Sequence, residues 1–388
     1  MSALGRRDNT YSSQFRKEDT DGDPVGQQDP VLTISADDRA RLKYPQWAPV
    51  WDRRQELKFE NPKPFIHVDR ALFGDPTFES LLSVTGVEHE RLSPKLGSVV
   101  KGLQLSELTA TQKDDLALLV EQRGVVAFRG QDFKSQSFEF IKKWATHFGP
   151  LHVHPTSGSP LGQSVFHTTF RRGGASEQKN MMSDRLNALI WHSDVSYERQ
   201  PPGITIFTML QTGVGGDTQF IDTIEAYERL SPLMQELIQR LRVFTTSKDL
   251  TSVSASKGGV VRKESVDSVH PLVRYHPVLR RKCLFINKSF SRKIVGLKME
   301  ESDSLLMFLL HRIESCLDAH VRVRWDEETV VIWDNRRLVH TATFDWDSND
   351  IRHAFRVTTQ AERPVATEAE YHRWTPKLEQ EPFAVYKE

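Results

Sequence analysis

The sequence has little cysteine and no long run of apolar residues. Its two cysteines, Cys283 and Cys316, are too few for a disulfide framework or a cysteine-based metal cluster, and they suit a reducing compartment. No apolar stretch approaches the length that spans a bilayer, and the N-terminus lacks the pattern of a secretory signal peptide. We therefore expect a cytoplasmic protein with no membrane partner.

A dominant charge of one sign is also absent. The 388 residues include 52 basic and 52 acidic side chains, so the formal net charge is zero when the histidines are neutral. A nucleic-acid-binding domain usually carries a clear basic excess, so this balance argues against nucleic acid as a partner. With 38% apolar residues, the chain is long enough for one large domain or two ordinary ones.

Composition divides the chain into three regions. Residues 1–45 are polar and charged, which is typical of a disordered arm. Residues 46–94 contain two tryptophans and several prolines, and they predict an extended segment wrapped on the core. Residues 95–388 would form the main domain. Within it, residues 156–188 are rich in Gly, Ser, Arg and Asn and predict a lid over a neighbouring site.

Apolar patterns beyond residue 106 predict the fold class. Helical periodicity covers residues 111–123, 135–148, 225–243 and 300–317. Short alternating or continuous apolar runs predict strands at residues 124–128, 204–210, 219–221, 283–287, 321–325, 329–333 and 354–359. Many strands with few helices between them indicate a mostly antiparallel β core with helices outside, either a sandwich or a jelly roll.

The most informative stretch is residues 191–197, which contain His192 and Asp194. The flanking pattern predicts a strand followed by a bounded loop, and side chains at positions i and i+2 of a strand point to the same face. An imidazole and a carboxylate side by side are two of the three ligands of the facial triad that binds non-haem Fe(II). Alone the pair is weak evidence, because His67 and Asp69 repeat it in a segment that we interpret as structural.

Two later segments carry residues that suit such a site. His340 follows the predicted strand 329–333 and would supply the distant third ligand, although a surface-loop histidine fits its position equally well. Arg352 and Arg356 would share one strand face, with Ala354 between them. Two guanidiniums in this arrangement form a cleft for two anions or one dianion, and the alternative is an exposed basic edge.

In combination, these segments resemble the taurine dioxygenase family of Fe(II)/2-oxoglutarate oxygenases, and in particular its fungal branch that acts on sulfonates. The resemblance covers about residues 95–362. The motifs that carry it are Phe148-Gly149, His152-Val153-His154-Pro155, His192-x-Asp194, Pro201-Pro202-Gly203, Gly216-Asp217-Thr218, Phe285-Ile286-Asn287 with Phe290, Trp333-Asp334-Asn335-Arg336 with His340, and Arg352 with Arg356.

The resemblance implies a double-stranded β-helix (jelly roll) with flanking helices and a set of co-substrate residues. His192, Asp194 and His340 would bind Fe(II). Arg352 would pair with the distal carboxylate of 2-oxoglutarate, helped by the Thr218 hydroxyl. A facial triad leaves three positions on the metal, of which two suit a chelating 2-oxo acid and one suits dioxygen.

The resemblance also implies a substrate site and an activity. His154, Arg356 and the backbone amide of Val195 would face a sulfonate, and Phe290 would line the pocket. Ser157 stands where the family often has an aromatic residue, which would widen that pocket. The implied reaction is hydroxylation of a small anionic substrate, taurine or another alkylsulfonate, which releases sulfite and an aldehyde together with succinate and CO2.

Other functions remain open on the sequence alone. Within the same class, the substrate could be a sulfate ester, an aryloxy acid, an amino acid or a secondary metabolite. A zinc hydrolase could use the same His/Asp/His set, although zinc needs no second anion site. A non-catalytic β-sandwich binding protein is a third alternative. The oligomeric state is also open, a homo-oligomer included.

Overall fold

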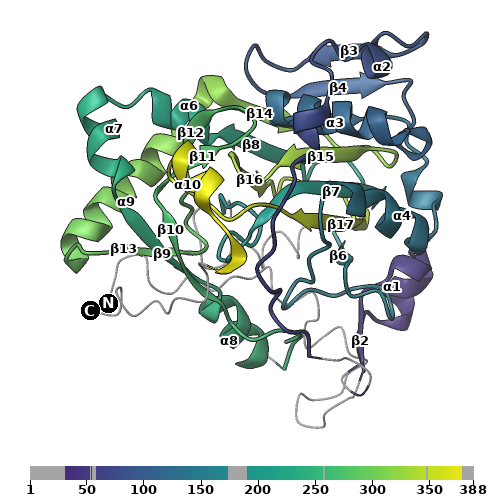
Figure 1. Ribbon diagram of the computed structural model, residues 1–388. Helices are drawn as coiled ribbons and strands as arrows, with labels where there is room; N and C mark the ends of the chain where they lie inside the picture. The colour runs from purple at the N-terminus through teal and green to yellow at the C-terminus, as the bar shows by residue number, and fades with distance from the viewer. Residues whose placement is uncertain are drawn as a thin grey trace.

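A computed structural model describes residues 31–377, except residues 53, 55–57, 174–189, 257 and 347 (Figure 1). The predicted arm and lid therefore lie partly outside the described residues. Residues 31–45 differ from the disorder expected of the arm. Strand β1 (Val31–Thr33) pairs with β2 (Val50–Asp52), and helix α1 (Ala36–Ala40) follows it. These residues fold because Leu32, Ile34 and Leu42 are buried.

A seven-stranded sheet forms the centre of the molecule. Its neighbouring strands are antiparallel, except that β4 and β5 are parallel. The order across the sheet is β3 (Glu88–Arg91), β4 (Ser98–Lys101), β5 (Val125–Phe128), β15 (Val330–Asp334), β7 (Pro202–Gln211), β17 (Arg352–Gln360) and β6 (His167–Arg171).

A second sheet of three strands packs against the large one. Its order is β14 (His320–Val323), β8 (Thr218–Asp222) and β16 (Leu338–Ala342), all antiparallel. Phe220 and Leu338 of this sheet share one apolar cluster with Val331 and Trp333 of β15. Two facing sheets of this kind are the core of a double-stranded β-helix, so the predicted jelly roll is confirmed.

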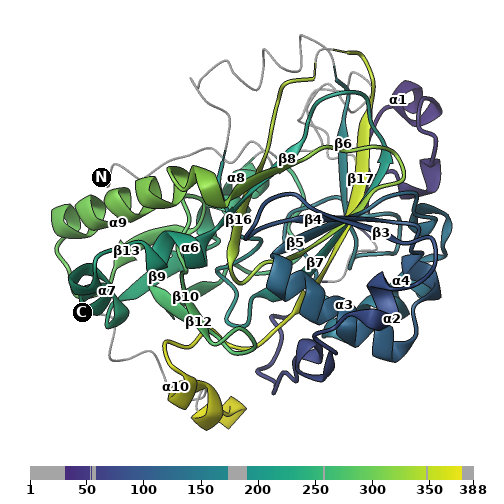
Figure 2. The ribbon, with the colours of Figure 1, turned by 90° about the horizontal axis from the view of Figure 1, so that it is seen from above.

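Helices cover the other face of the large sheet. Helices α2 (Glu79–Leu82), α3 (Ala110–Arg123) and α4 (Phe138–Ala145) lie together on that side (Figure 2). Val330 and Ile332 of β15 join their apolar cluster, whereas Val331 points to the opposite cluster between the sheets. Strand β15 is therefore buried on both faces, which explains its uninterrupted apolar sequence.

The remaining elements form a flank beside the three-stranded sheet. They are α6 (Thr223–Glu228), α7 (Pro232–Gln239), α8 (Lys248–Ser256), α9 (Met299–Glu314), α10 (Glu368–Arg373), the sheet β10 (Asp267–Pro271)-β9 (Arg242–Thr246)-β13 (Ser291–Ile294), and the hairpin β11 (Val273–His276)-β12 (Arg281–Leu284). None of the helices in the described parts of the chain is long and apolar enough to cross a membrane.

Two predicted elements outside residues 191–197 differ from the structure. The single helix expected over residues 225–243 is divided into α6 and α7 and followed by β9. The division occurs because the Ser231 side chain caps a new helix whose first residue, Pro232, has no N–H for a preceding helix. In addition, residues 167–171 of the predicted lid form β6, which pairs with β17 and is an edge strand of the large sheet.

Candidate active site

His192, Asp194 and His340 come together in the folded chain. The Nε2 atom of each histidine lies 3.7 Å from Oδ1 of Asp194, and the three candidate ligand atoms are all within 4.8 Å of one another. Both histidine rings are also close, with centroids 4.3 Å apart. One metal ion can therefore be reached by all three side chains, as the facial triad requires.

The backbone positions of these residues differ from those predicted. His340 lies within strand β16 and not in a loop. His192 makes a single bridge to it, in which each backbone N–H donates to the other residue's carbonyl oxygen, at 3.0 and 2.8 Å. Asp194 belongs to a turn in which Val195 has a φ of 40°. The turn, not the alternation of a longer strand, therefore brings Asp194 to His192.

Hydrogen bonding and burial prepare the two histidines as neutral ligands. The Nδ1 atom of His192 lies 2.9 Å from the carbonyl oxygen of Ile190, which can only accept, so Nδ1 carries the hydrogen and Nε2 keeps its lone pair. Burial lowers the pKa of His192, and burial together with the neighbouring His192 lowers the pKa of His340 to about 3. A neutral imidazole is the form that binds metal.

The carboxylate of Asp194 is ionised in this setting. Burial raises its pKa, but the positive charge of Arg356 is the main effect that opposes burial, and the pKa lies below its ordinary value. One carboxylate and two neutral imidazoles are the donor set that Fe(II) takes in non-haem oxygenases. The residues present therefore fit the implied metal.

A cavity beside the triad contains every residue that the sequence predicted for the site. Thr218 comes from β8, His340 comes from β16, and Arg352 and Arg356 come from β17. The other members lie outside the named strands. The predicted residues that line this cavity are His154, His192, Asp194, Val195, Thr218, Phe290, His340, Arg352 and Arg356. Because the cavity is lined from both sheets, the jelly roll itself brings the predicted groups together.

One end of the cavity combines a guanidinium with a hydroxyl and an indole. The Thr218 hydroxyl accepts a hydrogen bond from Nε1 of Trp325 at 3.0 Å. The guanidinium carbon of Arg352 lies 5.9 Å from the centre of the Trp325 ring. Arg352 is only 7% exposed. A buried guanidinium held over an aromatic ring suits a carboxylate, which it can bind through two parallel hydrogen bonds.

The other end of the cavity gathers Arg356, His154 and His167. The Arg356 guanidinium donates through Nη1 to Oδ1 of Asp194 and through Nη2 to Nδ1 of His167, the latter at 2.8 Å. The rings of His154 and His167 have centroids 4.8 Å apart. Burial lowers the pKa of both rings well below the ordinary value. This end therefore offers one fixed positive charge and two neutral rings.

Two important residues were not assigned a role from the sequence. His167 is one, and in β6 it and Thr169 are partly exposed and alternate with buried Thr168 and Phe170. Asn335 is the other, although the sequence analysis noted its motif. Its side-chain oxygen accepts from the N–H of Asp194 at 2.7 Å, and its Nδ2 donates to the Asp194 carbonyl at 2.9 Å. The amide thus fixes the backbone of a candidate ligand.

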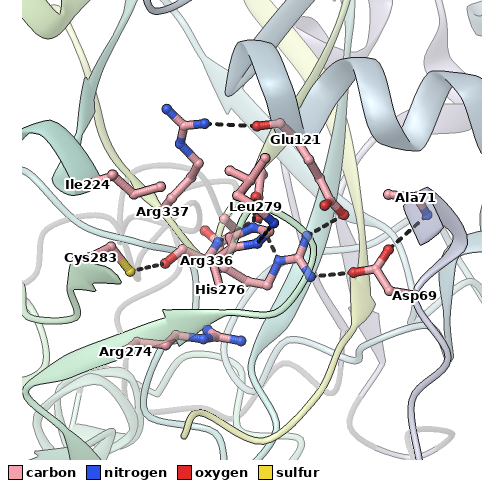
Figure 3. Close-up of polar contacts among 12 residues, drawn as sticks. Asp69, Ala71, Glu121, Ile224, Arg274, His276, Leu279, Cys283, Arg336 and Arg337 are labelled. Carbon is pink, nitrogen blue, oxygen red and sulfur yellow. Dashed lines mark hydrogen bonds and ion pairs between the residues drawn. The ribbon is translucent and has the colours of Figure 1, made fainter. Parts of the chain in front are cut away.

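The second His-x-Asp pair also has a third partner, since His67, Asp69 and Glu362 lie within 4.8 Å of one another. Here, however, the carboxylates already bind guanidiniums. Asp69 pairs with Arg336 (Figure 3), and Glu362 pairs with both Arg336 and Arg274. A cation placed here would meet two positive charges, so we interpret this cluster as structural.

Arg336 connects that cluster to the candidate site. Its guanidinium also binds Glu121 of α3 (Figure 3) and Asp334 at the end of β15. It is 2% exposed and adjoins Asn335 in the turn between β15 and β16. Four buried carboxylates from separate segments therefore hold the turn that carries Asn335 and leads into β16, where His340 lies.

Comparison with known proteins agrees with the geometry. Residues 88–358 match the family described as Taurine catabolism dioxygenase TauD, TfdA family. The chain is 44% identical over 340 residues to the alpha-ketoglutarate-dependent sulfonate dioxygenase of Saccharomyces cerevisiae. This match covers 86% of this chain and 82% of the yeast protein. It is 36% identical over 344 residues to the alpha-ketoglutarate-dependent dioxygenase cnsP of Penicillium expansum, with 88% and 92% covered.

A solved structure supports the same assignment. The crystal structure of a taurine dioxygenase from Burkholderia xenovorans is similar to this fold with a TM-score of 0.58 and 25% sequence identity. The match covers 72% of this chain and 91% of that one. On the family match, the two fungal relatives and the shared fold, this chain belongs to the TauD/TfdA family of dioxygenases.

Proposed function

We propose that this protein is an Fe(II)- and 2-oxoglutarate-dependent dioxygenase that hydroxylates a small alkylsulfonate such as taurine. The observation that carries the proposal is that one cavity combines three groups: the His192, Asp194 and His340 triad, the guanidinium of Arg352, and the guanidinium of Arg356. A metal site alone would fit many reactions. Two separate guanidiniums on the same cavity, that of buried Arg352 and that of partly buried Arg356, fit one metal-chelating acid and one anionic substrate.

Different residues of the cavity would bind 2-oxoglutarate and the anionic substrate. Arg352 and Thr218 would bind the distal carboxylate of 2-oxoglutarate at the Trp325 end of the cavity. Arg356, His154 and the backbone amide of Val195 would bind the head group of the substrate, and Phe290 would form an apolar wall beside it. Fe(II), held by the triad, would supply the redox chemistry that couples the two substrates.

The overall reaction balances for an alkylsulfonate. One oxygen atom of dioxygen enters succinate as 2-oxoglutarate loses CO2, and the other becomes a hydroxyl on the carbon beside sulfur. The carbon–sulfur bond then breaks, the hydroxyl becomes the carbonyl of an aldehyde, and sulfite leaves with the electron pair while the hydroxyl proton is released. The protein's contribution is to hold that carbon near the metal, which decides which C–H bond reacts.

Ser157 favours a wider range of sulfonates than taurine alone. It is 6% exposed and lines the cavity where many members of the family would present an aromatic ring. A substrate panel should therefore include larger alkyl and aryl sulfonates, and also sulfate esters and other small acids as the alternative substrate class.

The decisive experiment measures succinate and sulfite in parallel over this panel. We expect both products to appear in equal amounts with at least one sulfonate, and we expect anaerobic Fe(II) plus 2-oxoglutarate to give a weak visible absorption band. Release of sulfate instead of sulfite would identify a sulfate ester as the substrate. Product formation in the absence of 2-oxoglutarate would contradict the reaction class.

A further inference from the structure

His167 lies directly beside Arg356 because of the register of two strands. Strands β6 and β17 pair antiparallel, and His167 is the cross-strand partner of Arg356. Their side chains meet, with Nη2 of Arg356 2.8 Å from Nδ1 of His167. Both residues line the candidate cavity. The pairing is therefore fixed by the sheet and not by a chance meeting of flexible side chains.

This contact determines which ring nitrogen of His167 carries the hydrogen. A guanidinium has five N–H donors and no acceptor, so Nδ1 of His167 must accept. In the neutral ring the hydrogen then resides on Nε2. His167 consequently presents an N–H donor on the side of its ring away from Arg356.

His154 has the same arrangement. Its Nδ1 accepts a hydrogen bond from the backbone N–H of Thr156 at 3.2 Å, which again places the hydrogen on Nε2. His192 has the opposite arrangement, because its Nδ1 donates to a carbonyl oxygen. The hydrogen-bond partners therefore give His192 a free lone pair on Nε2, which suits metal binding. They give His154 and His167 an N–H on Nε2, which suits donation to an anion.

We propose that His167 is the third side chain of the substrate-anion site, beside Arg356, His154 and the backbone amide of Val195. In this site Nε2–H of His167 donates to one oxygen of the bound head group. The inference rests on the proposed function and extends it. Three side-chain donors, from β17, β6 and the segment after α4, suit the three oxygens of a sulfonate better than the two oxygens of a planar carboxylate. His167 would therefore contribute to the preference for tetrahedral oxyanions.

Two isosteric substitutions separate direct contact from support of Arg356. The amide of His167→Gln places a donor near the position of Nε2 but removes the acceptor at Nδ1. The amide of His167→Asn keeps an acceptor near Nδ1 but has no donor at the position of Nε2. His89→Gln, on the exposed strand β3, serves as the matched control.

The measurement is the dissociation constant of taurine and of β-alanine, its carboxylate counterpart, with the protein loaded anaerobically with Fe(II) and 2-oxoglutarate. We expect His167→Asn to weaken taurine binding about 10- to 100-fold, the range for a hydrogen bond to a charged group. His167→Gln and the control should stay within about threefold of the parent, because both keep that donor. β-Alanine affinity should change less than taurine affinity in His167→Asn.

Two results would overturn the proposal. If both His167 variants bind taurine like the parent, His167 does not contact the anion. If His167→Gln loses as much affinity as His167→Asn, a donor at the Nε2 position does not explain the effect, and if it loses more, the residue acts by accepting from Arg356. Binding of 2-oxoglutarate shows that each variant is folded. If the Asn variant fails that check, His167→Leu, which has neither donor nor acceptor, replaces it, and parent-like taurine affinity in that variant would overturn the proposal.

Failure of the proposed function looks different from failure of this inference. A parent protein that binds 2-oxoglutarate but no sulfonate would contradict the proposed substrate class, and the role of His167 would be rejected with it. A parent that releases sulfite from taurine, together with His167 variants that bind taurine normally, would contradict only the inference.

Discussion

Asn335 and Asp194 exchange two hydrogen bonds that run in opposite directions. The N–H of Asp194 donates to Oδ1 of Asn335 at 2.7 Å, and Nδ2 of Asn335 donates to the Asp194 carbonyl at 2.9 Å. One side-chain amide therefore replaces the strand partner that Asp194 lacks, since this residue lies in a turn. The contact links the turn between β15 and β16 to the residue that carries the candidate ligand carboxylate.

Removing this amide should weaken metal binding without removing a ligand. Substitution Asn335→Ala leaves the backbone N–H and C=O of Asp194 without their partners in a buried place, so the carboxylate loses its fixed direction. Loss of such supporting contacts typically costs 10- to 100-fold in metal affinity. Anaerobic Fe(II) titration measures this, and Asn349→Ala in an exposed loop is the control. An unchanged affinity would show that the turn holds Asp194 by itself.

The two His-x-Asp pairs should respond differently to substitution. His192→Ala removes one of three ligands and should abolish detectable Fe(II) binding and turnover. His67→Ala should leave Fe(II) affinity within about threefold of the parent, because its neighbours Asp69 and Glu362 already pair with arginines. The same Fe(II) titration compares both variants. Loss of iron binding in His67→Ala alone would mean that the second cluster is the metal site.

Arg352→Lys should affect 2-oxoglutarate more than the substrate. Lysine keeps the charge but replaces a planar fork, which can bond both carboxylate oxygens, with a single ammonium group. Truncating one partner of a buried charged pair costs about 2–5 kcal/mol, and the conservative change should fall at the lower end. The apparent KM for 2-oxoglutarate should therefore rise at least about tenfold, while the affinity for iron is unchanged. A parent-like KM would place the distal carboxylate elsewhere.

The sequence predicted which residues come together better than it predicted their local backbone. His192, Asp194 and His340 could be named because the types and order of the residues carry the chemistry. The strand assumed for Asp194 is a turn, because Val195 takes a left-handed backbone conformation that apolar periodicity does not reveal. In the same way, His340 lies in β16 because it pairs with Phe220 of β8, which is a long-range contact.

Tertiary contacts also explain the residues that sequence reasoning missed. Residues 156–188 were interpreted as a lid from their polar composition. Five of them form β6, because pairing with β17 satisfies the backbone and buries Phe170. That pairing, between positions 189 residues apart, is what brings His167 to Arg356. Composition predicts exposure, but it cannot report a partner strand so distant in sequence.

Arg336 should be essential for stability. Its guanidinium binds Asp69, Glu121, Asp334 and Glu362, all of them buried. Substitution Arg336→Met removes the positive charge and leaves these carboxylates facing one another, which typically costs about 3–5 kcal/mol. Lys248→Met, which breaks the exposed pair with Asp267, should cost no more than about 1 kcal/mol. Urea unfolding compares the two, and similar losses would contradict a special role for Arg336.

His353 should make stability depend on pH. Its side chain is fully buried, and its Nε2 donates to the backbone carbonyl oxygen of Trp47 at 3.1 Å. Burial lowers its pKa from 6.5 to about 4, although that hydrogen bond opposes the shift. Between pH 6.5 and about pH 4, His353 of the unfolded chain binds a proton that His353 of the folded protein does not bind. The contribution of neutral His353 is therefore fully present above pH 6.5 and is lost as the pH falls toward 4.

The substitution His353→Gln isolates this effect, because glutamine keeps a donor for the Trp47 carbonyl but does not titrate. A shift of this size corresponds to at most about 3 kcal/mol of pH-dependent stability. Urea unfolding at several pH values from 7.5 to 4.5 should show a free energy of unfolding that falls less steeply in the variant than in the parent. His372→Gln, at an exposed position of α10, is the matched control. Parallel curves for the parent and His353→Gln would show that His353 adds nothing to the pH dependence of stability, and they would contradict the prediction.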